Sequence, residues 1–295
     1  MTAPVRPAGE GAAVVFGVLA VIMFSSNFVA TRHGLAHGLG LPELALIRYG
    51  VSGLIALPLL LRLGLGGLSW KQVALLVALG GIPYFLFTAI GLLFAPASHA
   101  AVLNPGGVVT AAPLLGWLLL RERPSRNVLL CLPILLAGLL LVGGAGLMKG
   151  APGAWIGDLI LYASGVQWAC YGIALRAWNV PGLRGAAIIT AGSLPWLPIQ
   201  VLALGPAESI SPILANPEAA LIQVVFQGLV VGVGGTALYS VALSRLGPAR
   251  AAMFPPLVPA LGTLWAALLL GEVVTLPQVI GAALVILGMV IGTRR

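Results

Sequence analysis

The sequence predicts an all-α integral membrane protein of ten transmembrane helices, arranged as two inverted five-helix repeats around a central cavity. Three observations predict this fold. The 295 residues are 60% hydrophobic and only 7% charged, whereas soluble domains average about 25% charged residues. The apolar residues form long runs that end at charges or at Gly and Pro. Proline, glutamate and other residues of the first half recur in the second half at a constant offset in the sequence.

The apolar runs have the length of membrane-spanning helices, which need about 20 residues to cross the hydrocarbon core. The first run follows Arg6, is longer than the apolar core of a signal peptide and has no clear cleavage site. We therefore interpret it as an uncleaved first helix. The longest polar linker is the segment Gly205 to Pro217. The predicted spans are 11–32, 43–61, 71–93, 97–120, 127–147, 155–176, 183–203, 218–244, 249–270 and 276–292.

The basic residues support this map and predict its orientation. Short cytoplasmic loops of membrane proteins carry an excess of Lys and Arg. With the amino terminus inside, the segments on the opposite side hold only Arg32, Arg48 and Lys149 of the fifteen basic residues. Both termini and the linker loops on their side are therefore predicted to be cytoplasmic. These segments contain Arg6, Arg62, Lys71, Arg121, Arg123, Arg126, Arg176, Arg184, Arg245, Arg250, Arg294 and Arg295.

The internal repeat predicts two related halves, residues 1–150 and 151–295. Pro105 corresponds to Pro255 and Glu122 to Glu272 when the chain is compared with itself without gaps. Pro and Glu are uncommon in or beside membrane helices, so these matches weigh more than matching leucines. The offset spans five helices, an odd number, so the second half has the opposite topology. Inverted repeats of this kind are typical of secondary transporters.

Four groups of residues resemble motifs of one transporter family. They are the segment Phe24-Ser25-Ser26-Asn27-Phe28-Val29-Ala30, its counterpart Trp168-Ala169-Cys170-Tyr171, the pair Arg48-Tyr49, and the helix ends Leu119-Leu120-Arg121-Glu122 and Leu269-Leu270-Gly271-Glu272. They resemble the drug/metabolite transporter superfamily, in its branch of EamA-type ten-helix carriers, although that family often has Trp-Gly where this chain has Phe24-Ser25. Within the branch the chain is most similar to the YddG-type exporters of amino acids and related metabolites.

The resemblance implies a secondary transporter of the bacterial inner membrane that exports amino acids, aromatic or apolar ones included, and related metabolites by alternating access. It also implies that helices one, three, four, six, eight and nine surround the cavity. A lining of aromatic, amide and hydroxyl side chains suits small substrates with an apolar part and a few hydrogen-bonding groups. The candidate cavity residues are Asn27, Tyr84, Thr88, His99, Asn104, Gln167, Trp168, Tyr171 and Tyr239.

These candidates have alternative roles. A Tyr or Trp near a helix end often anchors the protein at the membrane interface, as expected for Trp70 and Trp155. His99 starts the fourth helix and is also interpretable as an interfacial side chain. Arg48 lies near the start of the second helix and could pair with Glu43 or Asp158. The preferred interpretation is that its side chain reaches the lipid headgroups.

Prolines at matching places in the two halves predict hinges. A proline lacks a backbone donor and frees the carbonyl four residues earlier. Such groups persist in a membrane where protein or a water-filled cavity satisfies them. The alternative is a kink that serves packing only. The predicted hinge residues are Pro105, Gly106 and Gly107 in the fourth helix, and Pro255 and Pro256 in the ninth.

Other functions find less support. An intramembrane enzyme acting on a lipid needs clustered acids, His or a nucleophile pair at one depth, and the sequence has no such cluster. A non-transporting helical scaffold stays an alternative. His33 and His37 have the spacing of metal ligands but no third ligand nearby, so no metal and no cofactor are expected. The partners expected are a small-molecule substrate and the bilayer, not nucleic acid, with a monomer or a homodimer left open because Gly288 and Gly292 permit close helix approach.

Overall fold

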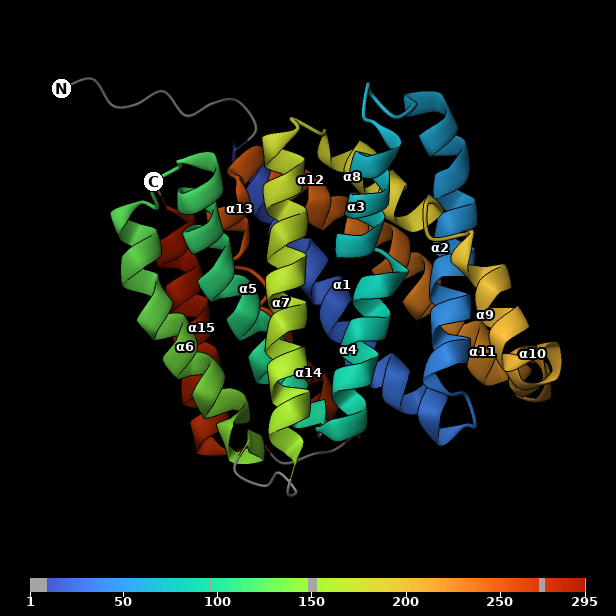
Figure 1. Cartoon of the computed structure of the whole chain (residues 1–295). Coiled ribbons are helices and arrows are strands. Elements are labelled where there is room, and N and C mark those ends of the chain that lie inside the picture. The colour runs from blue at the N-terminus through green and yellow to red at the C-terminus, as the bar shows by residue number, and fades with distance from the viewer. Residues whose placement is uncertain (1–9, 96, 148–152, 271–273, 295) are drawn as a thin grey trace.

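The computed structural model describes residues 10–95, 97–147, 153–270 and 274–294, and within these ranges the secondary structure is helical without a strand (Figure 1). The helices are α1 (Glu10–Ala36), α2 (Leu41–Leu63), α3 (Trp70–Gly80), α4 (Ile82–Phe94), α5 (Ala97–Leu120), α6 (Arg126–Leu147), α7 (Ala154–Ala177), α8 (Gly182–Ala191), α9 (Trp196–Leu204), α10 (Pro206–Ala215), α11 (Pro217–Gln223), the π-helix η1 (Val224–Gly235), α12 (Thr236–Leu246), α13 (Pro248–Ala251), α14 (Leu257–Leu270) and α15 (Leu276–Thr293).

Each predicted span coincides with one helix or with consecutive shorter helices. Among the described residues, eight helical segments are long and apolar enough to cross a membrane. The chain is therefore an all-helical, multi-pass membrane protein. The remaining two predicted spans correspond to α7 and to the α13–α14 pair, and the count of ten crossings stays a prediction.

The beginning and the end of the described chain meet at one end of the helix bundle. Glu10 forms an ion pair with Arg250, and the guanidinium of Arg250 also donates a 3.0 Å hydrogen bond to the carbonyl of Thr293. The first turn of α1, the start of α13 and the last turn of α15 are thus tied together (Figure 1). We call this end of the bundle the terminal end, and the opposite end, where α2, α5 and α7 begin, the far end.

In two of the divided spans, the breaks between the two helices contact each other. The span 71–93 divides at Gly81, and the span 183–203 divides at residues 192–195. The backbone N–H of Ile82 donates to Ser193 Oγ at 3.0 Å, and Tyr49 Oη donates to the Gly81 carbonyl at 3.0 Å. Backbone groups freed inside a membrane must find such partners. A Cβ at Gly81 would lie 2.5 Å from Ser193 Oγ, so only glycine fits there.

The span 218–244 contains a twelve-residue π-helix, η1, between α11 and α12. Its pattern of bonding five residues apart is extended by Thr236 Oγ1, which donates to the Val231 carbonyl at 3.1 Å. The π-form is rare and is usually confined to single turns near functional sites. The linker that precedes this span, Gly205 to Pro217, contains the short helix α10.

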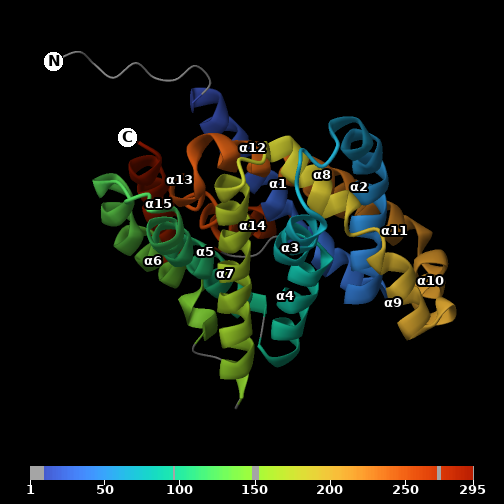
Figure 2. The ribbon, with the colours of Figure 1, turned by 45° about the horizontal axis from the view of Figure 1, so that its top comes forward.

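Helices α6 and α15 pack along each other at the side of the bundle, as Figures 1 and 2 both show. Glycines allow the close approach: a Cβ at Gly281 would lie 2.7 Å from the Gly138 carbonyl, and a Cβ at Gly288 would lie 2.7 Å from Leu135 Cγ. Gly288 and Gly292 are buried in this contact. Their close-packing face therefore lies inside the fold and does not form a free surface for a second copy.

Candidate functional site

Three tyrosines that the sequence singles out gather around Trp168 of α7. The Trp168 ring centroid lies 5.0 Å from that of Tyr84 on α4, 5.3 Å from that of Tyr171 on α7 and 5.7 Å from that of Tyr239 on α12. We call these residues the aromatic cluster. Phe24 of α1 extends it, because its ring lies 6.0 Å from that of Tyr239. The cluster thus joins α1 and α4 from the first half to α7 and α12 from the second.

The members of the cluster differ in accessibility. Tyr171 and Tyr239 are fully buried, with their hydroxyls against Ser240 Oγ (3.0 Å) and the Ala251 carbonyl (3.4 Å). Trp168 and Tyr84 are only half-buried. Trp168 and Tyr84 are therefore the members of the cluster that keep some exposure, while the two buried tyrosines pack against Trp168.

Asn104 of α5 connects the cluster to a hydrogen-bond network. Its Nδ2 donates to Ser164 Oγ on α7 at 2.7 Å and to Tyr84 Oη at 3.3 Å. Thr88 belongs to the same region, but its hydroxyl donates to the Tyr84 carbonyl one turn earlier, at 3.1 Å. Ser164 was not among the predicted residues, because a serine in an apolar helix gives no sign of its partner.

Helices α5 and α7 reach this network because two glycines let them cross in direct backbone contact. A Cβ at Gly165 would lie 2.0 Å from the Asn104 carbonyl, and a Cβ at Gly107 would lie 2.3 Å from the Tyr162 carbonyl. Any side chain at either position would separate the helices. Gly107 was predicted as a hinge residue, and in the structure it is a contact residue of the crossing.

The two predicted hinges differ in structure. Helix α5 is continuous through Pro105, Gly106 and Gly107. Pro255 and Pro256, by contrast, lie in the non-helical segment 252–256 between α13 and α14. A single proline kinks a helix, whereas the second of two prolines also drives the first out of the helical region. The expectation of equivalent interruptions in the two halves is therefore wrong for the local structure.

Among the described residues, five buried amide oxygens face no hydrogen-bond donor. They are Gln200 Oε1 on α9, and Asn27 Oδ1, Gln167 Oε1, Gln223 Oε1 and Gln227 Oε1. The amide nitrogens of Gln167, Gln223 and Gln227 are bonded, to the Ala78 carbonyl (2.7 Å), the Ala30 carbonyl (2.8 Å) and Thr31 Oγ1 (2.8 Å), respectively. An unpaired polar atom is costly in an apolar interior. Asn27 and Gln167 were predicted; Gln223 and Gln227 were missed, although two amides one turn apart in an apolar run were a usable sign.

His99 lies apart from the aromatic cluster. Its Nδ1 is 2.6 Å from Asp158 Oδ1, and the imidazole is 1% exposed. The pair joins the first turn of α5 to the second turn of α7, near the far end of the bundle. The predicted cavity residue is therefore a buried side chain that bonds Asp158 and connects two helices.

Arg48 has neither of the acidic partners that the sequence offered. Among the described residues no carboxylate pairs with it, and Asp158 pairs with His99. Its guanidinium instead lies over the ring of Phe85 on α4, 6.0 Å from the centroid, and over that of Tyr49 at 5.7 Å.

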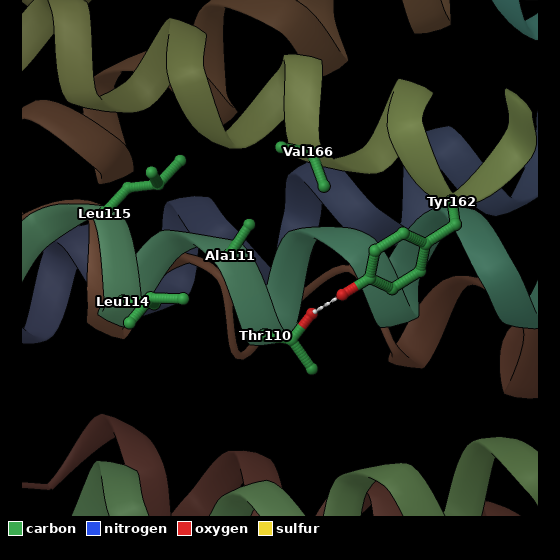
Figure 3. A pocket seen from close by; sticks show the side chains of 6 residues that line it. All are labelled: Thr110, Ala111, Leu114, Leu115, Tyr162 and Val166. Atoms are coloured by element: carbon green, nitrogen blue, oxygen red, sulfur yellow. Dashed lines mark hydrogen bonds between the residues drawn. The ribbon is translucent and has the colours of Figure 1, made fainter. Parts of the chain in front are cut away.

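Two hollows lie outside the aromatic cluster, and neither is lined by a predicted cavity residue. One, of about 200 Å³, lies between α5 and α7 (Figure 3), where Thr110 Oγ1 and Tyr162 Oη are hydrogen-bonded at 2.8 Å. Leu114 and Tyr162 are exposed there, so this hollow opens on the bundle surface. The other, of about 310 Å³, lies at the far end beside His33, His37 and Glu218.

Comparisons with known proteins agree with this architecture. The EamA-like transporter family matches twice, over residues 11–144 and 155–293. A probable amino-acid metabolite efflux pump of Salmonella typhimurium is 28% identical over 93% of this chain and 92% of its own length. The protein of the same description from Escherichia coli is 27% identical over 94% of this chain and 93% of its own. A solved crystal structure with 21% identity has the same fold, with a TM-score of 0.74 over 95% of this chain and 96% of the other.

Proposed function

Because the chain belongs to the EamA-like transporter family, we propose that it exports amino acids and related small metabolites, aromatic or apolar ones included, by alternating access. The family and the curated relatives are transporters, so the chain is a transporter and the intramembrane enzyme is no longer a candidate. Its substrate is a small molecule. The efflux pumps of Salmonella and Escherichia support amino acids and their metabolites as the substrate class.

The observation that carries the proposal is the aromatic cluster with its attached amides. It combines flat apolar surfaces, on Trp168 and Tyr84, with the hydrogen-bonding groups of Asn104 and Gln167. Such a combination binds small amphipathic molecules. Its residues come from both halves of the chain, and transporters built from inverted repeats bind substrate where the repeats meet.

The two family matches, one in each half, support the division into two repeats. In an inverted pair, Pro105 lies toward the far end and the segment 252–256 toward the terminal end. Bending at one place and then at the other would open the two sides of the substrate site in turn. The membrane is the bacterial inner membrane, with both termini in the cytoplasm, as the excess of basic residues at the terminal end supports.

Flux measurements on purified protein in liposomes test this function. Amino acids from aromatic to charged are presented one at a time, with and without a pH gradient. We expect flux of aromatic and apolar amino acids, and a loss of about tenfold for Trp168→Leu, which removes the central ring. Trp155→Leu is the matched control, because Trp155 lies on the same helix and is 64% exposed. Absence of flux for every amino acid would refute the proposed substrate class.

A further inference from the structure

Arg48 is a cation inside a membrane-spanning helix, and no carboxylate among the described residues neutralises it. It lies seven residues after Leu41, about 10 Å along α2 at 1.5 Å per residue. A charged side chain at that depth is costly and usually marks a substrate or ion pathway. No described carboxylate pairs with it, and its contacts are the rings of Phe85 and Tyr49. An anion that reached it would therefore meet an unpaired guanidinium.

The neighbours of Arg48 show that it faces the interior of the bundle. Ser52, one turn later on the same side of α2, packs on Gly232 of η1, where a Cβ would lie 2.8 Å from Ser52 Cβ. Tyr49, the next residue, points at α4 and bonds the Gly81 carbonyl. Arg48 thus lies between η1 and α4. The surface of α2 toward the lipid is formed instead by residues such as Leu54 and Leu61, which are 63% and 75% exposed.

Two of the unpaired amide oxygens lie on helices that adjoin this place. Gln227 is on η1, which packs on α2 through Gly228 and Val51. Asn27 is on α1, one turn from Thr31, the residue that accepts from the Gln227 amide nitrogen. Counted from the far ends of their helices, Asn27 and Gln227 lie about 13–15 Å deep, close to the depth of Arg48. The same region thus has one unpaired cation and two unpaired acceptors.

These groups adjoin the aromatic cluster. On α1, Asn27 follows Phe24 by less than one turn, and Phe24 contacts Tyr239. On α4, Phe85, under the guanidinium, follows Tyr84, whose ring contacts Trp168. The polar groups and the aromatic rings thus lie within one turn of each other on α1 and on α4.

We propose that Arg48 binds the carboxylate of a zwitterionic α-amino acid while the amide oxygens of Asn27 and Gln227 accept from its ammonium group. The side chain of the amino acid then lies against Trp168 and Tyr84. A guanidinium binds a carboxylate in a planar, bidentate manner, and an ammonium group supplies the donors that the two amide oxygens lack. The inference rests on the proposed transport function and names the groups by which the transporter selects its substrate.

Four related compounds separate the parts of this site: phenylalanine, phenylalanine amide, phenethylamine and 3-phenylpropionate. Binding to the purified full-length protein is measured by the shift of its thermal unfolding temperature and by competition with labelled phenylalanine. A site built to bond both charged groups rejects analogues that lack one of them. We expect the wild-type protein to prefer phenylalanine over the other three by at least about tenfold.

Replacing Arg48 should affect only those compounds that carry a carboxylate. Arg48→Gln should weaken the binding of phenylalanine by about tenfold and leave the binding of phenylalanine amide unchanged, because the amide has no carboxylate. Arg48→Lys should restore part of the preference, since it keeps the charge without the planar fork. Arg62→Gln is the matched control, as Arg62 is an exposed arginine at the other end of the same helix. Gln227→Leu should weaken the binding of phenylalanine and phenethylamine, which carry an ammonium group, but not that of 3-phenylpropionate, which carries none.

The outcomes are distinct. An unchanged preference for phenylalanine over its amide in Arg48→Gln would overturn the role of Arg48 while leaving the transport function intact. If Arg48→Gln fails to fold, Arg48→Lys and Gln227→Leu are tested in its place. If each of these variants changes the binding of all four compounds by the same factor, the proposal is overturned. A wild-type protein that neither transports amino acids nor binds any of the four compounds would overturn the proposed function together with this inference.

Discussion

Adding one methyl group at Gly107 should damage this protein, whereas the same change at the neighbouring Gly106 should not. Both glycines lie inside α5, directly after Pro105. A Cβ at Gly107 would lie 2.3 Å from the Tyr162 carbonyl on α7, whereas a Cβ at Gly106 would have no neighbour within 4 Å. The pair therefore separates the effect of a helix contact from the general effect of replacing glycine by alanine.

The contacts give the size of the effect. Raising the 2.3 Å contact to the 3.4 Å of an ordinary one requires α5 and α7 to separate by about 1 Å, because a backbone carbonyl cannot rotate away. The 2.7 Å bond from Asn104 to Ser164 would then stretch beyond hydrogen-bond range. Overpacking costs about 1–3 kcal/mol. Alanine gains about 1 kcal/mol of helix propensity over glycine at both positions, so the two variants should differ by about 1–3 kcal/mol.

Two measurements check this reasoning. Thermal unfolding in detergent, followed by tryptophan fluorescence, should place Gly106→Ala at or above the wild type and Gly107→Ala below it. Flux in liposomes should fall in Gly107→Ala even at temperatures where the protein stays folded, because the amide of Asn104 no longer holds the Tyr84 phenol in place. Equal unfolding temperatures and equal flux for the two variants would refute the tight crossing of α5 and α7.

Three further predictions concern the hinges, the α6–α15 contact and the orientation. Pro105→Ala should restore a backbone donor in α5 and slow transport while the protein stays folded, and Pro255→Ala should do the same at the other gate; full flux in both variants and in the double variant would show that these prolines serve packing only. Gly288→Leu should lower the folded yield and the unfolding temperature, and unchanged values would contradict the contact. In a protein without native cysteines, Ser211→Cys should react with a membrane-impermeant reagent from outside and Arg123→Cys only from the cytoplasm, and the reverse pattern would invert the topology.

The positions of the helices were predictable because hydropathy determines where a segment can leave the membrane. The span predicted at 97–120 is α5, and that predicted at 43–61 lies within α2 (Leu41–Leu63). Charges and Gly or Pro residues end the apolar runs, and the helices end at the same places. Such information is local, so a single sequence contains it.

The breaks inside the spans were not predictable, because the groups that permit them come from distant parts of the chain. Gly81 reads as an ordinary glycine of an apolar run. It ends α3 because Ser193 and Tyr49 supply the hydrogen bonds that the helix loses, and Ser193 is 111 residues away from Ile82, the residue whose N–H it binds. The twelve-residue π-helix has no local sign in the sequence either.

The candidate site was predictable by residue type but not by orientation. Aromatic and amide residues in apolar helices were recognisable, and Tyr84, Asn104 and Trp168 do meet. Rotation of each helix about its axis, however, depends on packing between helices, and hydropathy does not describe it. For this reason His99 was expected near the substrate but pairs with Asp158, and Arg48 was assigned to the headgroups although it lies between η1 and α4.

The glycines of the α6–α15 contact should differ in how readily they are replaced during evolution. A first methyl group at Gly281 would meet the Gly138 carbonyl, which is fixed backbone, whereas at Gly288 it would meet the end of the Leu135 side chain, which is able to change rotamer. Lipid is as apolar as the helices, so close packing alone must hold this pair together. Descendants of this chain should therefore exchange Gly288 for alanine or serine, with a compensating change at Leu135, long before either Gly138 or Gly281 is replaced.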